Sequence, residues 1–132
     1  VGSEMCIRDR ENSLGFLSAF EAKWVPAGAR LITTGAPVPA VYVLLDGRVE
    51  AHVNSSQGNP RLLAEVSAGA MLGESLFFRA EPATADCVTS RRCIVLELAA
   101  GDVPAVAKTF PQVVEAIALL RERRLLTNAW MS

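Results

Sequence analysis

The sequence has few cysteines and no excess of either charge, and each shortage excludes a class of protein. Its three cysteines, Cys6, Cys87 and Cys93, are an odd number without a close pair, which argues against a disulfide scaffold. Cys87 and Cys93 lie among Val, Ile and Leu, so we interpret them as buried thiols in a reducing, cytoplasmic setting. The formal net charge is −1 and there is no basic block, so the sequence predicts no surface for nucleic acid.

Long apolar runs and catalytic clusters are also missing. No run approaches the roughly 20 apolar residues that a membrane-spanning helix needs. The one histidine, His52, alternates with apolar residues, and we interpret it as a surface residue. The sequence has no Cys/His cluster with metal-ligand spacing and no local Ser/His/Asp arrangement, so it predicts neither a metal site nor catalytic residues.

The chain has enough apolar side chains for one core and too few residues for a second domain. It contains 132 residues, of which 51% are hydrophobic. Residues 1–10 show no regular spacing of apolar side chains. Their sequence, VGSEMCIRDR, resembles translated sequencing-adapter read-through, so we exclude them from the fold. On this interpretation the domain comprises residues 11–132, the natural N-terminus is missing, and the chain is a piece of a longer protein.

The domain begins with helical signals. Apolar residues at helical spacing follow a candidate cap at Asn12 or Ser13, which predicts a short helix over residues 12–22. Leu31 and Ile32 then indicate a short strand.

The strongest local signal is a predicted hairpin. Residues 41–45 are a β-rich run, and Asp46-Gly47 is a pair typical of a type I′ turn, because glycine accepts positive φ. Residues 48–53 then alternate between apolar and polar side chains, as in a strand with one solvent-exposed face. The sequence therefore predicts two paired strands joined by Asp46-Gly47.

The remaining signals indicate a fold that is mainly β, with flanking α-helices. A polar loop is predicted over residues 54–60, followed by strands over 61–66, 84–90 and 93–98. Many short strands with Gly or Pro between them predict an antiparallel, jelly-roll-like β-roll over about residues 23–100.

Helices are predicted after Gly101. Asp102 is expected to cap a short helix over residues 103–108. An apolar stripe then predicts a helix from residue 113 to about residue 129, so the C-terminal helices occupy about residues 101–129.

Residues 69–90 contain the features that indicate a ligand-binding segment. Gly69 and Gly73 bracket a short apolar run, and residues 74–78 predict one helical turn. The start of such a turn presents backbone N–H groups to an anion, and Gly73 has no Cβ to block an approaching group. The carboxylate of Glu74 can accept hydrogen bonds from ribose hydroxyls. These features together suit a sugar phosphate.

This segment resembles the phosphate-binding cassette of the cyclic-nucleotide-binding domain family, which includes catabolite-activator-type transcription factors and protein kinase A regulatory subunits. Gly73-Glu74 matches the opening of the cassette, Pro82 falls at the expected distance, and residues 84–88 match the strand that follows. The similarity covers most of residues 14–128. It implies a jelly-roll-like β-roll with flanking helices, and a non-catalytic sensor for cyclic AMP or cyclic GMP.

The resemblance also implies roles for individual residues. Backbone amides of residues 73–76 would hold the cyclic phosphate, Glu74 would contact the ribose 2′-hydroxyl, and the last helix would cover the base. The alternatives are that Glu74 is a carboxylate at a helix start and Thr84 an ordinary strand residue. The implied ligand-binding residues are Gly73, Glu74, Ser75, Leu76, Ala83, Thr84 and Ala85.

One position departs from the family pattern. The arginine that pairs with the phosphate belongs at position 83, where this sequence has Ala83. Losing a charge-assisted hydrogen bond of roughly 1.5–3 kcal/mol would weaken binding by ~10- to 150-fold. Arg79 is the nearest substitute, and the alternative is that it is solvated at a loop tip.

Ala83 leaves two hypotheses open. The first is a sensor that transmits ligand occupancy through its C-terminal helices to an effector part absent from this chain. The second is a degenerate module that acts in packing, or in homodimerisation through an apolar stripe. The stripe comprises Val113, Ile117 and Leu120.

Overall fold

The structure, a computed structural model, describes residues 14–54, 60–79 and 81–131. The described residues fall into two compact units. One is Phe20–Val103, and the other combines residues 14–19 with residues 104–131. The predictions for residues 1–10, for the caps Asn12 and Ser13, and for most of the 54–60 loop lie outside the described residues.

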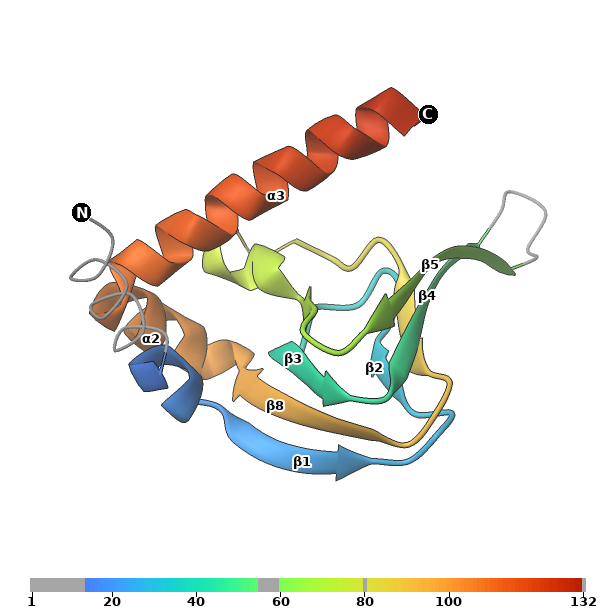
Figure 1. The fold of residues 1–132 in the computed structure, drawn as a ribbon, viewed down its shortest axis with the longest axis horizontal. Coiled ribbons are helices and arrows are strands. Elements are labelled where there is room, and N and C mark those ends of the chain that lie inside the picture. Colours follow the sequence, from blue (N-terminus) through green and yellow to red (C-terminus); the bar gives the residue numbers. More distant parts are fainter. Residues whose placement is uncertain (1–13, 55–59, 80, 132) are drawn as a thin grey trace. The chain divides into compact units, whose positions relative to one another are not determined.

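The Phe20–Val103 unit is a β-roll of two four-stranded antiparallel sheets (Figure 1). The strand order is β1-β8-β3-β6 in the first sheet and β2-β7-β4-β5 in the second. The strands are β1 Glu21–Val25, β2 Arg30–Ile32, β3 Ala40–Asp46, β4 Arg48–Asn54, β5 Pro60–Ser67, β6 Met71–Leu72, β7 Asp86–Thr89 and β8 Cys93–Ala99. This architecture confirms the predicted antiparallel β-roll with flanking helices.

The predicted hairpin at Asp46-Gly47 is wrong, because β3 and β4 belong to different sheets. β3 pairs with β6 and β8, whereas β4 pairs with β5 and β7. Gly47 has a φ of 107°, and a Cβ there would lie 2.6 Å from both the carbonyl oxygen of Arg92 and the Sγ of Cys93. Glycine therefore forms a tight corner at which the chain passes from one sheet to the other.

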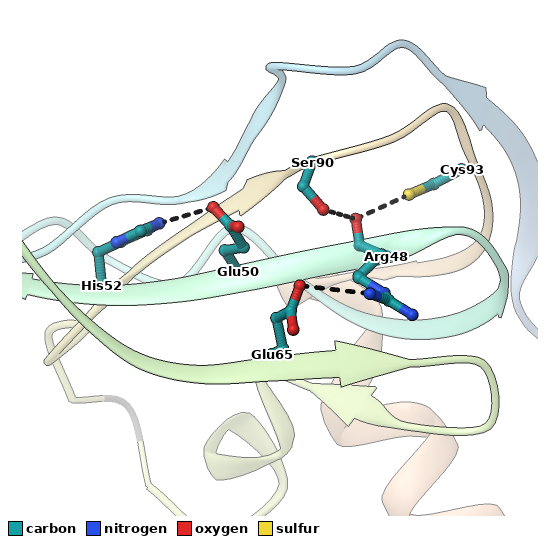
Figure 2. A network of polar contacts seen from close by, with 6 residues as sticks. All are labelled: Arg48, Glu50, His52, Glu65, Ser90 and Cys93. Atoms are coloured by element: carbon teal, nitrogen blue, oxygen red, sulfur yellow. Dashed lines mark hydrogen bonds and ion pairs between the residues drawn. The ribbon is translucent and has the colours of Figure 1, made fainter.

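A second corner, between β7 and β8, lies against the first. The backbone N–H and the hydroxyl of Ser90 donate to the carbonyl oxygen of Arg48 at 2.9 and 3.3 Å. The thiol of Cys93 donates to the same oxygen at 3.5 Å (Figure 2). These bonds tie the two corners together, so the pairing of β3 with β8 in one sheet continues as the pairing of β4 with β7 in the other.

Residues from both sheets form one apolar core. Leu44 and Val95 come from the first sheet and Val49 from the second, and none of the three is more than 1% exposed. Cys87 and Cys93 belong to the same cluster, which confirms that both thiols are buried. The buried hydroxyl of Thr89 donates to the carbonyl of Pro26 at 2.7 Å, so this polar group is satisfied inside the core.

The predicted helix over residues 12–22 is too long. Residues 14–18 are helical, but β1 begins at Glu21 and pairs with β8 from Glu21–Glu97 to Val25–Cys93. The first four residues of β1 are all exposed, so the strand lacks an alternating burial pattern. The predicted strand over 84–90 is also shorter, because β7 begins at Asp86.

Two helices follow the β-roll, as predicted. α2 comprises Val103–Thr109 and α3 comprises Pro111–Met131. Asp102, the predicted cap, lies in a 3-10 turn, η2 (Ala100–Asp102). Among the described residues no single helix is long and apolar enough to cross a membrane. The stretches Ala100–Thr109 and Pro111–Glu122 together have the length and apolar composition of a span, but the pair is bent by 109°.

Candidate functional site

The predicted ligand turn forms a single 3-10 turn, η1, over Glu74–Phe77. The N–H of Leu76 donates to the carbonyl of Gly73 at 3.2 Å, and the N–H groups of Phe78 and Arg79 both donate to the carbonyl of Ser75 at 2.9 Å. The turn is thus closed by its own backbone, and the helical prediction for residues 74–78 is confirmed over four of its five residues.

Position 73 requires glycine for two reasons, its backbone conformation and the closeness of neighbouring atoms. Its φ of 75° and ψ of 18° are left-handed. A Cβ would lie 2.5 Å from the carbonyl oxygen of Ala40 and 3.1 Å from Cγ1 of Val38. Glycine therefore lets η1 pack against the start of β3. This packing accounts for the glycine without any ligand, whereas the sequence analysis attributed it to the approach of a ligand.

Ala83 is fixed by backbone bonds and by apolar packing. Its N–H donates to the carbonyl of Ala36 at 3.0 Å, and its carbonyl accepts from the N–H of Gly35 at 2.8 Å. Its side chain packs against the buried core cluster. Thr84 is exposed and Ala85 is half-buried just before β7. Position 83 therefore presents a methyl group where the family resemblance implies a guanidinium.

The thiol of Cys87 in β7 has a raised pKa. Burial raises the pKa of the Cys87 thiol to about 11, and the negative charges of Asp86 and Glu74 contribute to the rise. Residues 83–85 of the predicted site lead directly into β7.

The charges in this region are mostly negative. The N–H of Thr34 donates to Oδ1 of Asp86 at 2.7 Å, and this bond is the main reason why the pKa of Asp86 lies below its ordinary value. Arg79 pairs with Glu81, with 2.9 Å between Nη1 and Oε1, and its side chain is 74% exposed. This geometry favours the interpretation of Arg79 as a solvated loop residue over its role as a phosphate ligand.

A cavity of about 380 Å³ lies beside η1, within the β-roll unit. Leu76 belongs both to the predicted site and to the wall of this cavity. The lining residues are Gly35, Pro37, Val38, Leu76, Glu81, Pro82 and Ala100. They come from segments far apart in the sequence, and a bridge between Pro37 and Pro82 joins two of these segments. No local sequence signal identifies such a cavity, and the sequence analysis missed it.

His52 and Arg48 each pair with a glutamate on the second sheet (Figure 2). Its Nε2 lies 3.1 Å from Oε2 of Glu50, and Nη1 of Arg48 lies 3.5 Å from Oε1 of Glu65. The side chain of His52, interpreted as a surface residue, is 26% exposed. Within the described ranges, no group of three or more His, Cys, Asp or Glu side chains is arranged to hold a metal ion.

Comparison with known families identifies the fold. The Cyclic nucleotide-binding domain family matches residues 22–110, which is more than half of the chain. This chain belongs to the cyclic nucleotide-binding domain family. A search of curated proteins gives no match.

Solved structures agree with this assignment. The Catabolite Activator Protein of Thermus thermophilus is 26% identical with a TM-score of 0.82, over 91% of this chain and 56% of that protein. The N-terminal domain of a transcriptional regulator from Streptomyces coelicolor A3(2) is 27% identical with a TM-score of 0.74, over 89% and 84%. This cyclic nucleotide-binding domain thus spans little more than half the length of the Thermus protein.

A more distant relative shares the fold. The regulatory subunit of a cAMP-independent protein kinase A from Trypanosoma brucei is 19% identical with a TM-score of 0.68, over 83% of this chain and 40% of that protein. The ligand roles of residues 73–76 and 83–85 in this cyclic nucleotide-binding domain stay predictions.

Proposed function

We propose that this chain is a non-catalytic sensor domain that binds cyclic AMP or cyclic GMP at η1 and residues 83–85. The observation that carries the proposal is the match of residues 22–110 to the cyclic nucleotide-binding domain family, with the turn η1 formed directly after Gly73. The N–H groups at the start of a helical turn point toward its N-terminal end, where they suit the cyclic phosphate. The N–H of Leu76 would exchange its bond to the carbonyl of Gly73 for one to the phosphate. The carboxylate of Glu74 suits the ribose 2′-hydroxyl.

Binding at this site is expected to be weak. Ala83 supplies no positive charge, Arg79 pairs with Glu81, and Glu74 adds a negative charge. The C-terminal helices have two arrangements, and the ligand shifts the balance between them only if it binds more tightly to the domain in one arrangement than in the other. Those helices pass the signal to an effector part outside this chain.

Calorimetry on the full chain with cyclic AMP and cyclic GMP tests the proposal. We expect Ala83→Arg to tighten binding by ~10- to 150-fold, because it restores a charge-assisted hydrogen bond to the phosphate. Ser67→Arg adds the same charge at an exposed position at the end of β5 and is expected to leave the affinity unchanged.

A further variant separates a repaired site from a general gain of charge. In the Ala83→Arg background, Glu74→Gln is expected to weaken binding, because a neutral amide is a poorer acceptor for the ribose hydroxyl than a carboxylate. Circular dichroism verifies that each variant is folded. If neither the natural chain nor folded Ala83→Arg releases heat at millimolar nucleotide, the proposal fails.

We infer a second candidate function from two observations. The side chain of Ala83 packs on the apolar core, which suits a site that no longer holds a phosphate. Of the predicted stripe in α3, Leu120 is 60% exposed, whereas Val113 and Ile117 are half-buried. Leu119, next to Leu120, is 59% exposed, and the two exposed leucines suit a helix that packs on a second copy. The alternative function is therefore a degenerate module that dimerises without cyclic nucleotide.

We also infer a cytoplasmic setting, without contacts of these residues to nucleic acid. The free, buried thiols of Cys87 and Cys93 support a reducing compartment. The net charge of −1 offers no general attraction for a polyanion.

A further inference from the structure

The cavity beside η1 has the size and the walls of a small-molecule site. Its volume of about 380 Å³ lies within the range of roughly 300–1,000 Å³ that is typical of ligand pockets. Pro37, Val38, Leu76 and Pro82 contribute apolar wall, so the cavity suits an aromatic or aliphatic group.

Glu81 gives this apolar cavity a single charge. Among the described lining residues it alone is ionisable, and its side chain is 43% exposed. Oε1 of Glu81 pairs with Arg79, but a carboxylate has about four acceptor positions and accepts further donors. A ligand with an ammonium group thus complements the cavity in both shape and charge.

We propose that this cavity is a second ligand site, which takes a small apolar amine with its ammonium group on Glu81. The site differs chemically from the proposed cyclic nucleotide site, which takes an anion. It goes beyond the proposed function, because Gly35, Val38, Glu81 and Ala100 take no part in nucleotide binding. Leu76 belongs to both the cavity wall and η1, so an occupant holds the turn in place.

A matched pair of probes tests the charge preference. Tryptamine and indole-3-acetate share an indole ring, but the first carries an ammonium group and the second a carboxylate. In an NMR titration of the full chain, tryptamine is expected to shift the amide signals of Val38, Leu76, Glu81 and Ala100. Indole-3-acetate is expected to shift them much less, because Glu81 repels its carboxylate.

Two substitutions of opposite effect identify the partner of the ammonium group. Glu81→Gln is expected to weaken tryptamine binding by ~2- to 5-fold, the range for a partly exposed ion pair. Arg79→Ala is expected to strengthen it, because Glu81 loses its internal cation. Glu65→Gln removes another arginine-paired carboxylate and serves as a control without effect.

A blocking variant and the distribution of shifts complete the test. Ala100→Leu fills part of the cavity and is expected to abolish the shifts, while its remaining spectrum verifies the fold. Equal responses to both probes, no response to tryptamine, or no effect of Glu81→Gln would each overturn the proposal. So would shifts centred on Gly73 and Ala85, which would place the amine in the nucleotide site. Calorimetry with cyclic nucleotide in the absence of the amine tests the nucleotide site separately.

Discussion

At the residue scale, two positions require glycine because atoms of other segments lie where a Cβ would be. At Gly47 the backbone of Arg92 and the thiol of Cys93 occupy the space of a Cβ. At Gly73 the carbonyl of Ala40 does the same. Both residues also have positive φ, which L side chains rarely adopt. Each glycine thus combines a backbone requirement with a packing requirement, and the packing cost can be measured separately.

Substitution of Gly47 measures the cost of a Cβ at the corner. Gly47→Ala is expected to lower the free energy of unfolding by about 2–4 kcal/mol, from backbone strain and from the clash with Arg92. Gly28→Ala is the control, because Gly28 has a φ of 80° with nothing within 4 Å of the Cβ position. It is expected to cost about 1 kcal/mol. Urea unfolding measures both, and equal losses would show that the clash contributes nothing.

The same residue marks a limit of sequence analysis. Asp46-Gly47 correctly predicts a change of direction, because glycine at positive φ is a local property. The hairpin prediction fails because strand pairing is decided elsewhere: β3 pairs with β8, about 50 residues later in the chain. A dipeptide signal contains no information about such a distant partner.

At the element scale, Asp86 links the start of β7 to the segment after β2. Its Oδ1 accepts the N–H of Thr34 at 2.7 Å, and the charges of Arg30 and His52 also favour the carboxylate. The pKa of Asp86 is therefore below the ordinary value of 3.8. A carboxyl group with a lowered pKa stabilises the fold above its unfolded pKa, and this contribution is lost as the pH falls through the folded pKa.

This link predicts an acid-dependent stability. Asp86→Asn is expected to be less stable than the natural chain at pH 6, because a neutral amide accepts the N–H of Thr34 less strongly. The difference is expected to begin to shrink as the pH falls below about 3.8, and to be lost once the pH has fallen through the lower pKa of the folded state, where the carboxyl group of the natural chain is protonated as well. Urea unfolding from pH 6 to pH 2.5 measures it, with Asp46→Asn as a control for the loss of one negative charge. A difference that is constant with pH would contradict the assignment.

Elements with an internal pattern were predictable, and elements defined by their neighbours were not. Residues 48–53 alternate, and β4 forms there. β1 has exposed residues on both faces, so only its pairing with β8 defines it. The turn at residues 74–77 was predictable because its glycine and its length are local. The cavity was not, because residues 35–38 and 81–82 come together only in the fold.

At the scale of the whole molecule, the residues proposed for ligand binding and those proposed for dimerisation belong to different units. The nucleotide site and the cavity lie in Phe20–Val103, whereas the exposed leucines of α3 belong to the unit with residues 104–131. The order of the family's motifs along the chain predicted the β-roll and the turn at residues 74–77. The oligomeric state does not follow from that order, because it depends on whether a second copy covers the exposed apolar side chains.

Sedimentation of the full chain over a range of concentrations tests dimerisation through α3. We expect a dimer, because burying Leu119 and Leu120 removes exposed apolar area from water. Leu120→Gln is expected to weaken the dimer by about tenfold or more, since a fully buried leucine contributes roughly 1.5–3 kcal/mol. Glu65→Gln, which introduces the same side chain at an exposed position of β5 outside α3, is the control without effect. A monomer at every concentration would contradict the dimer and leave the α3 leucines to another partner.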